Sequence, residues 1–123
     1  MSAARIDTAV IIAVGSELLT PHRVDTNSLF LTGRLNELAI EVHRKVVVGD
    51  DRDRLAQELD RGLADADLVV LIGGLGPTDD DLTRDALAAA VGAPLVERRE
   101  IVESIRERFA ARRLAMPEIN RRQ

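Results

Sequence analysis

The stretch VVLIGGLGPTDDDLTRDALAAAVG, residues 69–92, decides the fold. Its apolar start is typical of a buried strand, and its alanine-rich end is typical of a helix closed by a glycine C-cap at Gly92. Between them lies a glycine-rich turn that carries three consecutive aspartates, Asp79, Asp80 and Asp81. A strand, a glycine turn and a helix together suit a bound phosphate. The carboxylates at the same turn therefore need an explanation.

The rest of the chain repeats this alternation of strands and helices. Apolar runs predict strands, and helical spacing of apolar residues predicts helices, one of which carries the leucine stripe Leu55, Leu59 and Leu63. The predicted strands are residues 8–15, 41–50 and 67–74; the predicted helices are 26–40, 52–66, 82–92 and 99–113, with a further one opening at 116–123 and a loop at 16–25. Gly33, inside one of these helices, indicates close packing. The alternation implies an α/β fold, in which a mostly parallel sheet is covered by helices on both faces.

Composition narrows the class of protein. A chain of 123 residues with 46% hydrophobic and 31% charged residues fits one globular domain. A net charge of −4 and only 2% aromatic residues argue against a nucleic-acid partner. The first apolar run is too short to cross a membrane and lacks a signal-peptide pattern, so a cytoplasmic protein is the default expectation. The absence of cysteine excludes disulfides and thiolate chemistry.

Arginine is concentrated near the C-terminal end. Eight of the sixteen arginines lie in residues 97–123, where five acidic residues oppose them. The pattern favours a solvated helix face. Contact with a phosphate ligand or with a partner subunit is the alternative.

Ligands of open parallel sheets bind at the carboxyl ends of the strands, which directs attention to the third strand. Gly73, Gly74 and Gly76 allow backbone angles closed to other residues, so their amides can converge on an anion. A helix beginning near Asp81 or Leu82 adds a positive partial charge. The alternative is that the glycines only make a tight turn while Asp81 caps the helix.

A divalent cation would reconcile the carboxylates with a phosphate, because it takes hard oxygen ligands from both. Asp50 follows the second predicted strand and, if that strand is adjacent to the third, could meet Asp80 or Asp81. The first strand end adds Gly15 and Ser16, which could approach a ligand through backbone and hydroxyl.

Three further polar side chains stand near these strand ends. Glu17 could act as ligand, base or cap, and Asn27 could contact a ring or ribose edge. For Asp25 and Asn27 simple helix capping is the alternative. No Ser-His-Asp or Cys-His set is visible, which argues against covalent acyl chemistry.

Taken together, these motifs resemble the N-terminal domain of competence/damage-inducible protein A (CinA), in the molybdopterin-binding MoaB/Mog-like superfamily. The resemblance runs from about residue 8 to residue 123, and its most specific part is GGLGPTDDDLT at residues 73–83. Leu75 stands where the molybdenum-cofactor enzymes have threonine, which favours the CinA branch.

The resemblance implies a three-layer α/β/α sandwich with a pocket for a phosphorylated nucleotide or pterin ligand. It also implies metal-dependent ADP-ribose pyrophosphatase activity, with Mg²⁺ or Co²⁺ as the metal. The alternatives are a binding module without turnover and adenylyl transfer to molybdopterin. Homo-oligomers are usual in the superfamily. The family's domain continues with another strand and a glycine-rich loop, so the domain at 1–123 is expected to be incomplete at its C-terminus.

The residue roles carried over from the resemblance fall into three sets. Asp50 and Asp81 would bind the metal and act in catalysis, and Asp80 or Glu17 would be the general base. The residues that would hold phosphate are Gly73, Gly74, Gly76 and Thr78. The residues that would line the rest of the pocket are Gly15, Ser16, Glu17 and Asn27.

Overall fold

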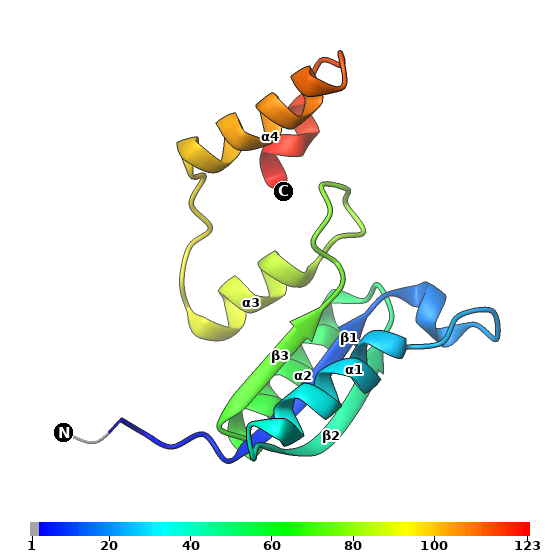
Figure 1. Ribbon diagram of the computed structural model, residues 1–123, viewed down its shortest axis with the longest axis vertical. Coiled ribbons are helices and arrows are strands. Elements are labelled where there is room, and N and C mark those ends of the chain that lie inside the picture. Colours follow the sequence, from blue (N-terminus) through cyan, green and yellow to red (C-terminus); the bar gives the residue numbers. More distant parts are fainter. Residues whose placement is uncertain (1–2) are drawn as a thin grey trace.

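A computed structural model describes residues 3–123 (Figure 1). Met1 and Ser2, with which the predicted domain begins, lie outside the described residues. The strands are β1 (Thr8–Val14), β2 (Glu41–Val48) and β3 (Leu68–Ile72); the helices are α1 (Thr26–Glu37), α2 (Arg52–Asp65), α3 (Thr83–Val91) and α4 (Arg99–Ala111); the short 3₁₀ helices are η1 (Ser16–Leu19) and η2 (Glu118–Arg122).

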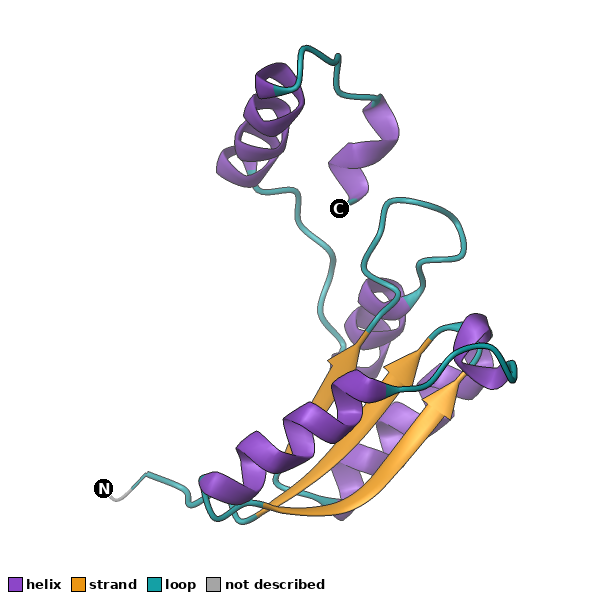
Figure 2. Cartoon of the chain, turned by 45° about the vertical axis from the view of Figure 1, so that its right-hand side comes forward, coloured by secondary structure: helices purple, strands orange, loops and turns teal. Residues whose placement is uncertain are grey.

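The three strands form one parallel sheet in the order β2-β1-β3. Helix α1 packs on one face, while α2 and α3 cover the other (Figure 2). The predicted three-layer α/β/α sandwich is therefore confirmed. Strand β1 lies at its centre, and its residues 9–13 are fully buried, as an unbroken apolar run requires.

Side chains of β1 alternate between two cores. Val10 and Ile12 point toward α2 and pack with Leu55 and Leu59. Ile11 points the other way and packs, with its neighbour Ala9, on Leu35 of α1. Because successive strand residues face opposite sides, one apolar strand fills the space under both helix layers. β1 is thus the element that holds the sandwich together.

The leucine stripe of α2 is only partly buried. Leu55 and Leu59 are 0% and 1% exposed, but Leu63 is 49% exposed. A four-residue step overshoots a helical turn by about 40°, so the stripe drifts away from the sheet. Gly62 takes the third place instead, where an added Cβ would lie 3.1 Å from the side chain of Val69.

Several predicted boundaries change. Residues 16–19, predicted as loop, form η1, and 118–122 form η2 rather than the start of an α-helix. Helix α1 ends at Glu37 because Ala39 takes a positive φ of 60° and the Ile40 amide bonds back to the carbonyl of Leu35. The close packing predicted at Gly33 is wrong within the described chain, since a Cβ there would meet no atom within 4 Å.

The C-terminal elements stand apart from the sandwich. Residues 93–98 form an exposed connection that leads from α3 to α4, and η2 folds back beside α4 (Figure 1). In α4 only Val102 is buried. Among residues 3–123, no helix combines the length and the apolarity needed to cross a membrane.

Candidate functional site at the carboxyl edge of the sheet

The glycine turn after β3 is packed tightly on the end of β1. Gly73 and Gly74 have φ angles of 87° and 65°, which favour glycine. A Cβ at Gly73 would lie 2.2 Å from the carbonyl oxygen of Val14, and one at Gly74 would lie 2.3 Å from Oγ1 of Thr83. Both the backbone angles and the lack of space therefore require glycine at these two positions.

Thr83 attaches the turn to the start of α3. Its buried hydroxyl donates to the carbonyl of Gly73 over 2.7 Å, and its amide donates to the carbonyl of Gly74 over 3.3 Å. The prediction did not single out Thr83. Its place as the last residue of the motif at 73–83 was the only signal in the sequence.

Arg84 continues the same role along the turn. One guanidinium nitrogen donates to the carbonyl of Leu75 over 2.6 Å and another to the carbonyl of Gly76 over 2.7 Å. This residue was also missed. Together, Thr83 and Arg84 donate hydrogen bonds to four consecutive carbonyls, those of residues 73–76.

Asp81 closes a turn of its own. Its Oδ2 accepts from the hydroxyl of Thr78 over 2.6 Å and from the amide of Thr78 over 3.0 Å. The hydroxyl bond is the largest influence and lowers the pKa of Asp81 below its usual value, and bonds from the Thr78 and Gly76 amides act in the same direction. The N-cap of α3 is Leu82 and has no side-chain bond, so the alternative of Asp81 as a helix cap is wrong.

The first and second strand ends meet through Ser16. The Asp50 amide donates to Oγ of Ser16 over 2.9 Å, and the Gly15 amide donates to the carbonyl of Val48 over 2.9 Å. Glu17 folds back over Gly15, where an added Cβ would lie 2.5 Å from the carboxylate. Gly15, Ser16 and Glu17 therefore lie beside Asp50 at this edge of the sheet.

Asp50 and Asp81 stand at strand ends that are not adjacent. Strand β1 lies between β2 and β3, so their ends are roughly 10 Å apart, or two strand spacings. The assumption that these two strands are neighbours is wrong. Within residues 3–123, no three His, Cys, Asp or Glu side chains cluster so as to hold a metal. A cation site here would need ligand phosphates to complete its coordination, which Mg²⁺ sites commonly use. Asp50 and Asp81 as metal ligands stay a prediction.

The remaining candidate residues lie at the start of α1 and in the loop beside Asp81. Asp25 caps α1 by accepting from the amide of Ser28 over 3.0 Å and from its hydroxyl, so the capping alternative is confirmed for Asp25. Asn27 lies exposed in the first turn of α1 and does not cap it. Asp80 is exposed in the loop next to Asp81.

A cleft of about 420 Å³ opens between the start of α3 and the C-terminal segment. Asp81 lines it on one side, and four arginines also line it: Arg84, Arg98, Arg121 and Arg122. We call it the arginine cleft. Its volume falls within the range of small-molecule sites.

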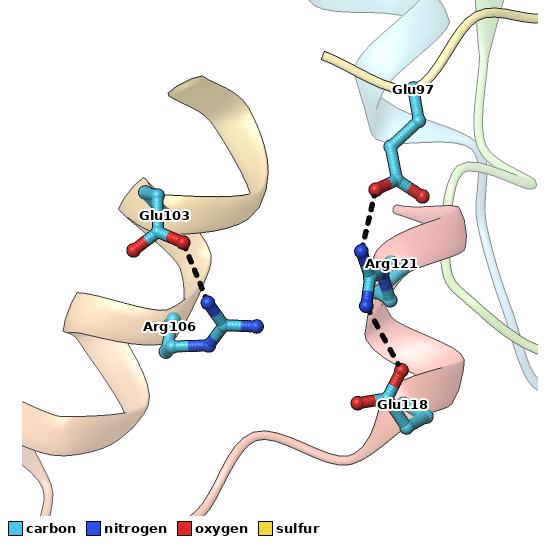
Figure 3. Close-up of polar contacts among 5 residues, drawn as sticks. All are labelled: Glu97, Glu103, Arg106, Glu118 and Arg121. Atoms are coloured by element: carbon cyan, nitrogen blue, oxygen red, sulfur yellow. Dashed lines mark hydrogen bonds and ion pairs between the residues drawn. The ribbon is translucent and has the colours of Figure 1, made fainter. Parts of the chain in front are cut away.

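Two of these arginines pair with carboxylates of the chain. Arg122 pairs with Asp79 over 2.8 Å. Arg121 lies between Glu97 and Glu118, at 2.9 Å and 3.3 Å (Figure 3). These bonds raise the pKa of both guanidinium groups. The arginines of α4 are exposed, as predicted for a solvated helix face, whereas Arg122 of η2 contacts Asp79 in the loop that precedes α3.

A parallel α/β sheet with a glycine turn at its carboxyl edge is typical of domains that bind small ligands. The family model described as "Probable molybdopterin binding domain" matches residues 10–122. The chain therefore belongs to this molybdopterin-binding family, and its relatives place it on the CinA-like branch.

The relatives agree with that assignment. CinA-like proteins from Solibacter usitatus and Koribacter versatilis are 50% and 52% identical to it over 115 residues. Those residues are 94% of this chain and 28% of each relative, so the chain spans little more than a quarter of their length.

Solved structures extend the likeness. The structure of the protein CinA from Thermoplasma acidophilum matches with a TM-score of 0.84 at 32% identity, over 95% of this chain and 68% of that one. A molybdopterin biosynthesis protein from Mycobacterium abscessus matches with a TM-score of 0.63 at 26% identity, over 89% and 68% of the two chains. MoaB from Thermus thermophilus, at 23% identity and a TM-score of 0.63 over 68% and 54% of the chains, shares the fold.

Proposed function

We propose that this domain binds a phosphorylated nucleotide- or pterin-type ligand at the carboxyl edge of its sheet. We further propose that it hydrolyses a pyrophosphate bond of the ADP-ribose type when a divalent cation is bound. The first part of the proposal rests on the glycine turn, and the second on the carboxylates around it.

The observation that carries the proposal is that four consecutive carbonyls of the turn already accept hydrogen bonds. Those of Gly73 and Gly74 accept from Thr83, and those of Leu75 and Gly76 accept from Arg84. Carbonyl oxygens repel an anion. Asp81 accepts from the amides of Thr78 and Gly76. With the four carbonyls held toward α3, the amides of residues 73–75 are therefore the groups left to receive a phosphate. Helix α3 is nine residues long, and the positive partial charge at its N-terminus also attracts a phosphate.

The carboxylates give the site its proposed chemistry. Asp81 and Asp50 would hold the cation together with ligand phosphates, and a cation so placed polarises a phosphoryl oxygen. Asp80 or Glu17, both exposed, would accept the proton of the attacking water. Thr78 would hold Asp81 in its ionised form through the 2.6 Å hydroxyl bond.

A second candidate is ligand binding without turnover. It is favoured by the separation of Asp50 from Asp81 across β1, because carboxylates that do not meet make a poor catalytic pair. The family's description names molybdopterin, and the similar Mycobacterium abscessus structure is that of a molybdopterin biosynthesis protein, so a pterin ligand or adenylyl transfer to it fits this candidate.

The test is product analysis after incubation of the chain with ADP-ribose, with and without Mg²⁺ or Co²⁺. Metal-dependent AMP and ribose-5-phosphate, lost in Asp50→Asn and Asp81→Asn, would support hydrolysis. Asp60→Asn is the matched control, because Asp60 is an exposed carboxylate in the middle of α2. Saturable ligand binding without product would support the second candidate. Turnover that survives both site variants would contradict the assignment of the site.

A further inference from the structure

The arginine cleft adjoins the glycine turn but is not explained by it. Asp81 and Arg84 line the cleft and also bond to the turn, Asp81 to Thr78 and Arg84 to Gly76. A ligand phosphate on the turn therefore lies next to the guanidinium groups of the C-terminal segment. Those groups come from residues some 40 positions further along the chain, so the fold brings two separate sets of anion-binding groups to one place.

The pair between Arg122 and Asp79 is easily exchanged. The Asp79 side chain is 96% exposed, and the Arg122 side chain is 47% exposed. Ion pairs in such positions contribute little to stability because water solvates both charges. A phosphate group carries more charge than a carboxylate and accepts two parallel N–H bonds from a guanidinium. A ligand phosphate is therefore a better partner for Arg122 than Asp79 is.

Arg121 is held in a different way. Glu97 and Glu118 contact it from opposite sides, which fixes its guanidinium and neutralises Glu97 at the wall of the cleft (Figure 3). Arg98 also lines the cleft and bonds to Glu100 over 2.8 Å. Arg98 and Arg122 each pair with one carboxylate, but the Asp79 side chain is 96% exposed and the Glu100 side chain 64%. Arg122 is therefore the arginine of the cleft that most easily changes partners.

Part of the remaining wall of the cleft is apolar, and Asp85 and Gln123 also line it. Leu95 and Val96 line it and are 57% and 72% exposed. Exposed apolar side chains beside guanidinium groups suit a ligand that joins a ring system to phosphates.

We propose that the arginine cleft is a second phosphate subsite, where a ligand phosphate displaces Asp79 from Arg122 while another phosphate occupies the glycine turn. The domain thereby selects ligands with two linked phosphate groups over ligands with one. This inference rests on the phosphate binding proposed above for the turn. It does not depend on hydrolysis.

The test is isothermal titration calorimetry of the folded chain with inorganic pyrophosphate and with orthophosphate, in buffer free of divalent cations. The native chain is expected to bind pyrophosphate more tightly than orthophosphate. Arg122→Ala should weaken pyrophosphate binding about tenfold and leave orthophosphate binding little changed. Asp79→Asn should tighten pyrophosphate binding by up to about fivefold, because Arg122 no longer has to be released.

Two further variants isolate the effect. Arg106→Ala removes an arginine that forms a 2.6 Å pair with Glu103 on α4 and does not line the cleft, and it should leave both affinities unchanged (Figure 3). In the double variant Asp79→Asn/Arg122→Ala the tightening should disappear, because it acts through Arg122. If the double variant still binds pyrophosphate more tightly, Asp79 merely repels any anion. That result would overturn the proposal that a phosphate displaces Asp79 from Arg122.

Three other results would overturn the second phosphate subsite. The proposal fails if the native chain does not bind pyrophosphate or if Arg122→Ala binds it as tightly as the native chain. It fails too if Asp79→Asn weakens binding as Arg122→Ala does, because the pair would then only dock the C-terminal segment. If Arg122→Ala weakens pyrophosphate binding as expected but the native chain does not cleave ADP-ribose, the second phosphate subsite is supported and the proposed hydrolysis fails.

Discussion

Thr83 shows how one buried hydroxyl shapes the site. It is 2% exposed and is the donor to the carbonyl of Gly73. Thr83→Val keeps the shape and removes that donor, so we expect a loss of about 1–3 kcal/mol in the free energy of unfolding, measured by urea denaturation.

Thr32→Val is the matched control for this change. The Thr32 hydroxyl donates over 2.7 Å to the carbonyl of Ser28, which keeps its helical partner in the variant. We expect the control to cost less than about 1 kcal/mol. Equal losses in the two variants would contradict the special role of Thr83.

Asp81 should make stability depend on pH. Its pKa in the folded chain lies below the usual value of 3.8, so the unfolded chain takes up the proton first as pH falls. The ionised carboxylate therefore stabilises the fold above that value, and this contribution is lost as pH falls through the folded pKa. The difference in unfolding free energy between the native chain and Asp81→Asn should shrink when urea denaturation is moved from pH 6 to pH 3. A difference that is the same at both pH values would show that the Thr78 bonds do not depend on the charge.

Sequence reasoning located the turn but not its bonds. The need for glycine at 73 and 74 and the presence of Asp81 in the site follow from residue type and spacing. The roles of Thr83 and Arg84 do not, because their partners are backbone carbonyls whose directions depend on the positive φ angles of the glycines. A local pattern does not specify those directions.

Helix α2 contains an internal comparison between two leucines. Leu59 is buried against β1, and Leu63, one step further along the predicted stripe, is half exposed. We expect Leu59→Ala to lower the free energy of unfolding by about 2–5 kcal/mol, because it leaves a cavity in the core. Leu63→Ala should cost no more than about 1 kcal/mol. Similar losses, measured by thermal or urea denaturation, would mean that α2 is rotated relative to this description.

The order of the strands was the main element that the sequence left undecided. Alternating strands and helices predict parallel pairing, but they fit the order β1-β2-β3 as well as the observed β2-β1-β3. One signal favoured the observed order. Strand β2 carries charges at Glu41, Arg44 and Lys45, which suit an edge, whereas β1 is apolar throughout. Asp50 and Asp81 were expected to meet because β2 was taken to lie beside β3, whereas β1 lies between them.

Protection from hydrogen exchange should differ greatly across the whole molecule. Residues 9–13 lie in the buried central strand, while residues 91–101 are all exposed. Amides of β1 should exchange only through global unfolding, and those of 95–98 within the shortest labelling time. Comparable protection in both segments, measured by mass spectrometry, would show that the C-terminal segment packs on the sandwich more firmly than described.

The whole molecule places three features at one edge: the glycine turn, the carboxylates of the strand ends and the arginine cleft. The first two follow from the parallel alternation, because carboxyl ends of parallel strands share an edge. The third required the fold, since Arg122 and Asp79 are 43 residues apart and their approach depends on the path of residues 93–118. Composition suggested an anion contact only as an alternative.

The central claim is that the glycine turn receives a ligand phosphate, and a titration with ADP-ribose followed by ¹H–¹⁵N NMR tests it most directly. The amide signals of Gly73, Gly74 and Gly76 should shift and saturate together. Those of Gly33, in α1, and Gly62, packed on Val69, serve as internal controls and should stay in place. Saturable shifts at the three turn glycines would support the account. Turn signals that do not move at saturating ligand, or shifts confined to the control glycines, would contradict it.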